Sequence, residues 1–238
     1  MSFLNSKMQI FVTGTDTGIG KTVVSLLLMH NFFSKGYRPF YLKPFQTGCK
    51  TPYETGSDTL FIYRHIEQLK DLDPAGSVIY CFSQPKAPWF AARNESKRID
   101  ITRVEKIITQ KKAIYGPLII EGAGGLHVPI TENLLMIDLI EKLPAAMILV
   151  ARAGLGTINH TLLSIESLIR RGITPVAIIF VDSDSPNTPP DMIRENMEAV
   201  EKFSGISVLG TIGKIEDFSN PPSEYVELFK FIRSPSQA

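Results

Sequence analysis

The stretch that decides the fold of this chain is Gly14-Thr-Asp-Thr-Gly-Ile-Gly-Lys21-Thr22. An apolar run precedes it and a second one follows it, which predicts the order strand, glycine-rich turn, helix. Glycines allow backbone N–H groups to turn inward around phosphate oxygens, and the start of the following helix favours their negative charge. Lys21 would reach the outer phosphates and the Thr22 hydroxyl would bind Mg²⁺. The stretch therefore predicts a nucleotide site.

The spacing of this loop departs by one residue from the usual pattern G-x-x-x-x-G-K-[ST]. That pattern places its first glycine where this chain has Thr15, and Gly14 lies one position earlier. The alternative is a tight turn that caps an ordinary helix and leaves Lys21 exposed. A Gly-x-Gly-Lys-Thr order directly after a strand favours the nucleotide site.

The bulk composition excludes several classes of protein. With 238 residues, 21% charged and 44% hydrophobic, the chain fits a soluble globular protein. The formal charge of +1 gives no global attraction to nucleic acid or to anionic membranes. We expect one P-loop ATPase-like domain over residues 1–238, with loose termini at 1–6 and 234–238.

Cysteine and histidine usage indicates neither a disulfide framework nor a metal site built from these residues. Cys49 and Cys81 are the only cysteines. The histidines show no ligand spacing; they are His30, His65, His127 and His160. The amino terminus lacks the features of a signal peptide, and no run of about 18 apolar residues occurs. We expect a cytoplasmic protein.

Short apolar runs alternate with segments of helical periodicity along the chain. We expect strands at residues 8–13, 37–43, 78–80, 117–121, 145–151, 174–181 and 206–212. We expect helices at residues 21–34, 57–69, 101–113, 136–142, 157–171, 190–203 and 224–232, with irregular structure over most of 71–98. This alternation predicts an α/β fold with a mostly parallel central sheet, helices on both faces, and ligands beyond the carboxyl ends of the strands.

Polar residues at the ends of the expected strands are candidates for the site. Glu121 and Asp58 are placed to hold Mg²⁺ opposite Thr22. The alternatives are a solvated strand end for Glu121 and plain helix capping for Asp58. Lys43 lies beside the predicted phosphate site, which favours a functional lysine over a solvated one. Residues 154–159 (GLGTIN) fit an anion-accepting helix N-terminus and a plain N-cap equally well.

Five blocks of sequence, taken in order, resemble the dethiobiotin synthetase family. They are Gly14-Thr-Asp-Thr-Gly-Ile-Gly-Lys-Thr22, Lys43-Pro-Phe-Gln-Thr-Gly48, Ser57-Asp58, Glu121-Gly-Ala-Gly-Gly-Leu-His-Val-Pro129 and Leu155-Gly-Thr-Ile-Asn-His160. A P-loop alone would be weak support, whereas five blocks in register over most of the chain are specific. The resemblance implies a compact P-loop NTPase fold and a homodimer in which the partner chain completes the site.

The resemblance also implies an activity, that of an ATP-dependent cyclo-ligase in biotin biosynthesis. The substrates would be 7,8-diaminononanoate, CO₂ and MgATP. A carbamate forms on one amine and its oxygen attacks the γ-phosphate to give a carbamic–phosphoric anhydride. The second amine then closes the ureido ring, and ADP and phosphate are released.

The resemblance assigns a role to each candidate residue. Thr17, Lys21 and Lys43 would stabilise the carbamate and the transferring phosphoryl group, and Thr22, Asp58 and Glu121 would hold Mg²⁺. The nucleotide would contact Gly18, Ile19, Gly20, Lys21, Thr22, Val23, Asp58, Glu121, Gly122, Ala123, Gly124, Asp182 and Gly213. The diamine would contact Thr17, Lys43, Thr47, Gly124 and Gly125, together with Leu155, Gly156, Thr157 and Asn159 from the partner chain.

Two positions depart from the family pattern. Gly18 stands where some members carry Glu, so the loop offers no carboxylate there. Asp182-Ser183 stands where an Asn often recognises the base, and a carboxylate cannot donate a hydrogen bond to a ring nitrogen.

Two other functions remain as alternatives. A MinD/ParA-like switch ATPase would need a lysine where this chain has Asp16, and the expected last helix lacks the length and basic face of a membrane anchor. An amidating ligase such as cobyrinic acid diamide synthase would add a glutaminase domain, for which 238 residues leave no room.

Overall fold

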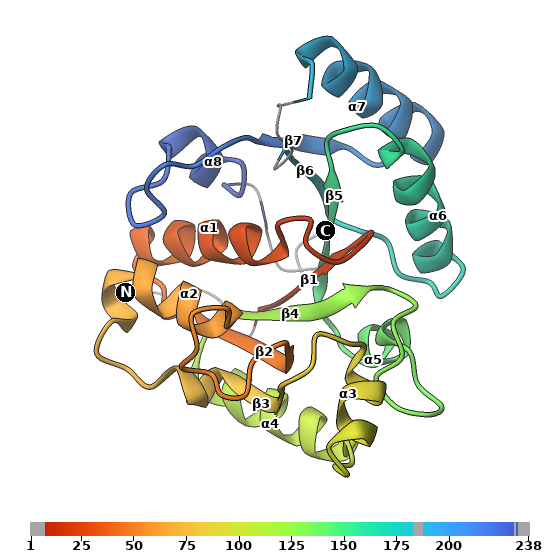
Figure 1. The fold of residues 1–238 in the computed structure, drawn as a ribbon. Helices are drawn as coiled ribbons and strands as arrows, with labels where there is room; N and C mark the ends of the chain where they lie inside the picture. Colours follow the sequence, from red (N-terminus) through yellow and green to blue (C-terminus); the bar gives the residue numbers. More distant parts are fainter. Residues whose placement is uncertain (1–7, 183–187, 231, 233–238) are drawn as a thin grey trace.

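The structure is a computed structural model that describes residues 8–182, 188–230 and 232 (Figure 1). Its strands are β1 (Gln9–Gly14), β2 (Phe40–Thr47), β3 (Val78–Phe82), β4 (Leu118–Gly125), β5 (Ala146–Arg152), β6 (Ala177–Val181) and β7 (Val208–Ile212). Its α-helices are α1 (Lys21–Ser34), α2 (Asp58–His65), α3 (Pro88–Asn94), α4 (Ile101–Ile114), α5 (Met136–Glu141), α6 (Thr157–Ile169), α7 (Pro190–Ser204) and α8 (Ser223–Glu227). Short 3₁₀ turns occupy Glu67–Leu69 and Pro74–Ser77.

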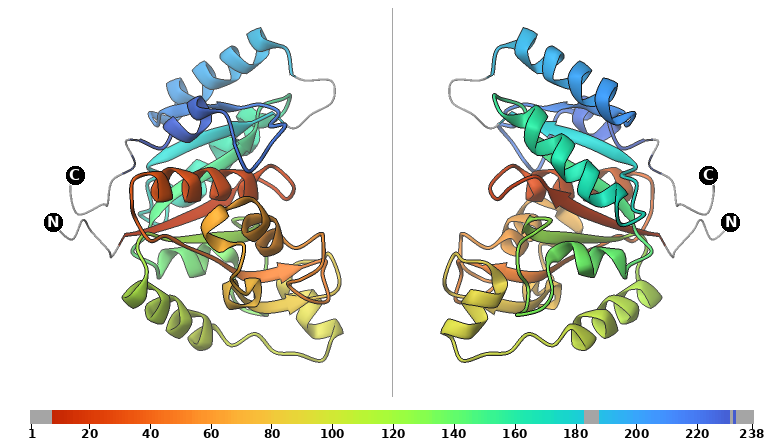
Figure 2. Two further views of the ribbon diagram at one scale, coloured as in Figure 1. Left: turned by 90° about the vertical axis from the view of Figure 1, so that its left-hand side faces the viewer. Right: turned by 90° about the vertical axis from the view of Figure 1, so that its right-hand side faces the viewer.

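The strands form one seven-stranded sheet in the order β3-β2-β4-β1-β5-β6-β7, and every pair is parallel. Helices cover both faces, with α1, α2 and α8 on one side and α4 to α7 on the other (Figures 1 and 2). The predicted fold class is therefore confirmed. Since parallel strands all point the same way, their carboxyl ends meet at one edge of the sheet, where β1 leads into the glycine-rich loop.

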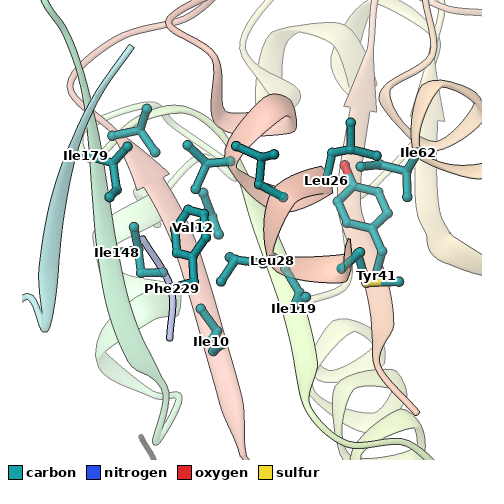
Figure 3. Close-up of a cluster of buried hydrophobic side chains, with 14 of the residues drawn as sticks. Ile10, Val12, Leu26, Leu28, Tyr41, Ile62, Ile119, Ile148, Ile179 and Phe229 are labelled. Carbon is teal, nitrogen blue, oxygen red and sulfur yellow. The ribbon is translucent and has the colours of Figure 1, made fainter. Parts of the chain in front are cut away.

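Strand residues alternate between the hydrophobic cores on the two faces of the sheet because successive side chains leave a strand on opposite faces. Ile10 and Val12 of β1 pack in the core beneath α1, whereas Phe11 between them packs in the core on the other face. Figure 3 shows the first of these cores, in which Tyr41 of β2 lies beside Leu26 of α1. The near-continuous apolar runs of the sequence thus reflect burial on both faces of the sheet.

The second strand is longer than its sequence suggests. We expect it to end at Lys43, but β2 continues to Thr47 and contains Pro44. Pro44 is tolerated because β2 pairs with β4 only as far as Leu42 and then with β3, and proline breaks a sheet only where its missing N–H is needed. Glu121 likewise lies inside β4, which runs on to Gly125, and does not end the strand.

Other expected bounds need correction. Residues 71–98 contain α3 in addition to β3, and Pro88 begins this helix as its first residue, a position that tolerates proline. The helix expected at 57–69 ends at His65 and continues as a 3₁₀ turn, and the last helix ends at Glu227 instead of 232. The expected loose termini and Ser183 lie outside the described residues.

None of the helices in the described part of the chain combines the length and apolar character that crossing a membrane requires.

Gly20 joins the loop to α1 in a conformation that only glycine adopts freely. Its φ is +91°, and an added Cβ would lie 2.7 Å from Cγ1 of Val181 on β6. Val181 in turn is buried at the end of its strand. The loop is therefore pressed against the sheet at a point where no side chain fits.

We predict that Gly20→Ala lowers the free energy of unfolding by more than Gly172→Ala does. Gly172 also has a positive φ, +72°, but an added Cβ there meets no atom within 4 Å, so only the left-handed strain of about 1–2 kcal/mol applies. At Gly20 the contact with Val181 adds a further cost of about 1–3 kcal/mol. Urea unfolding of the two variants measures the difference. Equal losses of unfolding free energy would show that the loop moves away from Val181 without an energetic cost.

Candidate functional site

A buried cluster of opposite charges lies at the edge of the sheet where the loop begins. The Lys43 ammonium is 2.6 Å from Oε1 of Glu121 and 2.8 Å from Oδ2 of Asp58. Lys43 is 5% exposed and Glu121 is 1% exposed. The pairing of β2 with β4 matches Leu42 to Ile120, so one further step along both strands brings Lys43 beside Glu121.

Lys43 and Asp58 both keep their charges because of the other members of the cluster. Burial lowers the pKa of Lys43, but the negative charges of Asp58 and Glu121 outweigh it and hold that pKa well above its usual value. Burial raises the pKa of Asp58, and the charge and hydrogen bond of Lys43 outweigh it and hold the Asp58 pKa below its usual value. Lys43 is therefore a fixed positive charge at neutral pH.

Thr22 connects this cluster to the loop. Its Oγ1 lies 3.1 Å from Oδ1 of Asp58 and 3.0 Å from Oε1 of Glu121. A hydroxyl and two carboxylates converge, and Mg²⁺ prefers such oxygen ligands, with phosphate oxygens and water completing its octahedron. Among the described residues, no group of three or more His, Cys, Asp or Glu side chains could hold a metal by itself. The donor set therefore fits Mg²⁺ bound together with a nucleotide.

The second lysine of the site, Lys21, has the opposite electrostatic environment. Its Nζ donates to the backbone oxygen of Asp16, at 2.6 Å, inside the loop. Burial first and the nearby positive charge of Lys43 second lower the pKa of Lys21 to about 8. An anion bound in the loop would favour the charged form of Lys21 and so raise its pKa.

The loop residues surround a pocket of about 410 Å³. Its walls include many of the predicted site residues, namely Thr17, Gly18, Gly20, Lys21, Thr22, Lys43, Thr47, Asp58, Glu121, Ala123 and Gly124. Of the other loop predictions, Ile19 is buried in the core, Val23 is half-buried on α1, and Gly122 and Gly125 continue β4 beside the pocket wall. The phosphate loop, the lysine strand and the carboxylate strand therefore share one cavity.

Other residues of the pocket and the charge cluster are not evident from sequence patterns. Gln46 lines the pocket and its Oε1 accepts the backbone N–H of Asp58 at 3.1 Å, which fixes the start of α2. Residues 85–88 (PKAP) form another wall. Ser25 and Tyr41 both bond to Glu121. Alternation along β2 would have placed Tyr41 on the same face as Lys43, but only the register with β4 shows its partner.

Tyr41 is a permanent donor to Glu121. Its hydroxyl lies 2.8 Å from Oε2 of Glu121. Burial and then the negative charge of Glu121 raise the Tyr41 pKa well above its usual value. The phenol therefore stays protonated at any physiological pH.

The segment that begins α6 lies apart from this pocket. Leu155, Gly156 and Thr157 line a smaller pocket of about 170 Å³ on the other side of the loop, with Thr15 and Asp16. Leu155 is 87% exposed. Asn159 is exposed on α6. The two pockets are walled by different parts of the same loop, and a role for this segment in a partner's site remains a prediction.

The residues predicted to meet the base lie at the ends of β6 and β7. Asp182 donates its backbone N–H to Ile212, so Asp182 and Gly213 are neighbours across the sheet. The carboxylate of Asp182 is buried and accepts hydrogen bonds from the backbone N–H and the hydroxyl of Thr188. It is thus already engaged within the chain.

Comparison with known proteins shows relatives over most of the chain. A family model described as an AAA domain matches residues 8–222. The ATP-dependent dethiobiotin synthetase BioD of Methanococcus vannielii is 34% identical over 93% of this chain and 98% of its own length. The protein of the same name from Paramagnetospirillum magneticum is 38% identical over 85% of this chain and 86% of its own length. The biotin biosynthesis bifunctional protein BioCD of Bordetella avium is 41% identical over 87% of this chain, which spans 40% of that longer protein.

Solved structures with a similar arrangement are more distant. The MinD cell division protein of Aquifex aeolicus superposes with a TM-score of 0.56 at 15% identity, covering 94% of this chain and 95% of that one. A ParA family ATPase from Chlorobium tepidum gives 0.53 at 16% identity, with 95% and 92% covered. This likeness shows a shared P-loop fold and does not favour the switch-ATPase alternative.

We predict that Lys43→Met lowers the free energy of unfolding far more than Lys21→Met at pH 7. Removing Lys43 leaves buried Glu121 without its counter-charge, which costs about 3–5 kcal/mol. Lys21 contacts a backbone oxygen and is itself disfavoured by burial, so its loss costs little. Urea unfolding in the absence of Mg²⁺ and nucleotide measures both.

A double variant, Lys43→Met with Glu121→Met, is the matched control. It removes the unpaired carboxylate together with the lysine, so it should be more stable than Lys43→Met alone. If the double variant is the less stable of the two, the charge cluster is not what the single substitution breaks.

Proposed function

The chain belongs to the dethiobiotin synthetase family, and from that membership we propose that it closes the ureido ring of dethiobiotin from 7,8-diaminononanoate, CO₂ and ATP. ADP and phosphate are the other products. The observation that carries the proposal is the position of Lys43, a charged lysine held by Asp58 and Glu121 in the same pocket as the phosphate loop. A second cation there serves a second anionic reactant besides ATP.

The proposed reaction joins carbon to nitrogen at the expense of one phosphoanhydride bond. One amine of the substrate adds CO₂ and loses a proton to form a carbamate. A carbamate oxygen attacks the γ-phosphorus and ADP leaves. The second amine attacks the carbamoyl carbon, its proton is lost, and phosphate departs with the carbamate oxygen. Holding both amines beside one activated carbonyl makes ring closure effectively unimolecular, worth up to about 7–11 kcal/mol of barrier when well aligned.

Phosphoryl transfer needs positioning and charge neutralisation more than a strong base. Lys21 and Thr17 would bind the outer phosphates and the carbamate, and Lys43 would lie between the two anions. Thr22, Asp58 and Glu121 would hold Mg²⁺, which neutralises charge on the phosphate oxygens when bound. The metal would share the carboxylates that Lys43 now balances, which leaves the ammonium available to the carbamate.

The remaining contacts follow from the pocket walls and from the family. Thr47 and Gly124 line the pocket beside Lys43 and would contact the diamine, with Gly125 at the end of β4.

We further propose a homodimer, in which the α6 segment of one chain approaches the diamine bound to its partner. The exposed side chain of Leu155 supports an apolar contact at that interface. Asp182 is occupied by Thr188, so we propose that the backbone around Gly213 contributes more to base binding than that carboxylate.

The direct test is to incubate the purified protein with 7,8-diaminononanoate, bicarbonate and MgATP. We expect dethiobiotin and ADP in equal amounts, dependent on all of the substrates. Formation of ADP without dethiobiotin, at a rate indifferent to the diamine, would contradict the proposal.

We predict that nucleotide binding takes up a proton above pH 8. The free protein holds the Lys21 pKa at about 8, and phosphate favours the charged form, so binding raises this pKa. Below pH 7 Lys21 is already charged and the affinity should be independent of this group. Above pH 8 the affinity should fall by up to about tenfold per pH unit. Calorimetry in two buffers of different ionisation enthalpy measures the proton taken up.

Lys21→Arg is the control for this pH dependence. Arginine stays charged at all accessible pH values, so the proton uptake should disappear even if the affinity is reduced. Proton uptake that persists in Lys21→Arg would assign the effect to another group.

A further inference from the structure

The two carboxylate oxygens of Glu121 have different partners. Oε1 faces the pocket, where it lies 2.6 Å from Lys43 Nζ and 3.0 Å from Thr22 Oγ1. Oε2 faces the interior, where it lies 2.8 Å from the hydroxyl of Tyr41 and 3.0 Å from that of Ser25. One oxygen is thus presented to the reacting groups and the other is held by the protein.

Both interior partners are buried. Tyr41 is 1% exposed and Ser25 is fully buried. Tyr41 belongs to β2 and its ring lies beside Leu26, as Figure 3 shows. Ser25 belongs to α1, one turn beyond Lys21. The carboxylate therefore accepts hydrogen bonds from a strand, β2, and from α1, the helix that follows the phosphate loop.

Tyr41 is the more dedicated donor of the two. Ser25 has a single hydroxyl proton, and the backbone oxygen of Lys21, also 3.0 Å away, competes with Glu121 for it. The Tyr41 hydroxyl donates to Oε2 from a buried ring. A carboxylate held by such a donor cannot exchange its two oxygens by rotating about its last torsion without breaking that bond.

We propose that Tyr41, assisted by Ser25, is a positioning residue that fixes the orientation in which Glu121 presents Oε1 to Mg²⁺ and to Lys43. The inference rests on the proposed function for the identity of the metal and the nucleotide. Hydrogen-bond partners behind a metal-binding side chain change metal affinity or activity by about 10- to 100-fold when they are removed. The ring of Tyr41 packs in the hydrophobic core, and its hydroxyl donates a hydrogen bond to Glu121 at the site.

Tyr41→Phe separates these two contributions because it keeps the ring and removes only the hydroxyl. The measurement is the Mg²⁺ concentration that gives half-maximal binding of a non-hydrolysable ATP analogue, followed by calorimetry without diamine or turnover. We expect this concentration to rise by about 10- to 100-fold. Ser25→Ala should raise it in the same direction by a smaller factor.

Tyr63→Phe is the matched control. Tyr63 is also buried, its hydroxyl bonds to Ser77 at 2.8 Å, and it lies on α2, the helix that begins at Asp58. It should lose thermal stability as Tyr41→Phe does and keep the Mg²⁺ requirement of the unmodified protein. If Tyr41→Phe lowers the melting temperature like Tyr63→Phe and leaves the Mg²⁺ requirement unchanged, the proposal is overturned.

Two further outcomes complete the test. Should Tyr41→Phe fail to fold, Ser25→Ala decides the question, since an unchanged Mg²⁺ requirement in it removes the proposed grip on Oε2. The binding readout is independent of ring closure. A shifted Mg²⁺ requirement in Tyr41→Phe therefore supports the positioning role even if the unmodified protein makes no dethiobiotin, which would defeat the proposed function alone.

Discussion

The structure depends on one buried ion cluster, in which the ammonium of Lys43 lies between the carboxylates of Asp58 and Glu121. A carboxylate that is 1% exposed cannot remain charged inside a protein without a counter-charge and hydrogen bonds. Satisfying that requirement brings together β2, β4, α2 and the first turns of α1. The phosphate loop, the lysine and the carboxylate oxygens proposed to bind Mg²⁺ are thus placed by the same constraint that makes this edge of the sheet stable.

The two lysines of the pocket are tuned in opposite directions by this cluster. The carboxylates keep the pKa of Lys43 high, whereas burial and the Lys43 charge lower the pKa of Lys21. A permanently charged lysine suits the binding of a carbamate that must not be protonated. Lys21, whose pKa is lowered, suits phosphate binding because the negative charge of the phosphate stabilises its charged form. A simple ATP-binding loop needs only the second kind.

Much of this arrangement can be predicted from the sequence because the chemistry lies where strands end. The glycine-rich loop, the strand–helix alternation and the carboxylates Asp58 and Glu121 all follow from local patterns, and these patterns predict the P-loop fold with its parallel sheet. The extension of β2 through Pro44 could not be predicted, since it depends on β2 changing partner from β4 to β3. Nor could the contact of Tyr41 with Glu121, because strand register is a property of two distant segments together. Gln46 and residues 85–88 read as ordinary loop and strand residues until the fold brings them to the pocket.

In the proposed reaction this pocket transfers phosphate to a carbamate and not to water. The most direct measurement follows the oxygen, with bicarbonate labelled in ¹⁸O, the diamine and MgATP, sampled over the first turnovers before the label exchanges with solvent. We expect the released phosphate to carry one labelled oxygen, transferred from the carbamate when the ring closes. Phosphate that carries an oxygen from water and none from bicarbonate would contradict it.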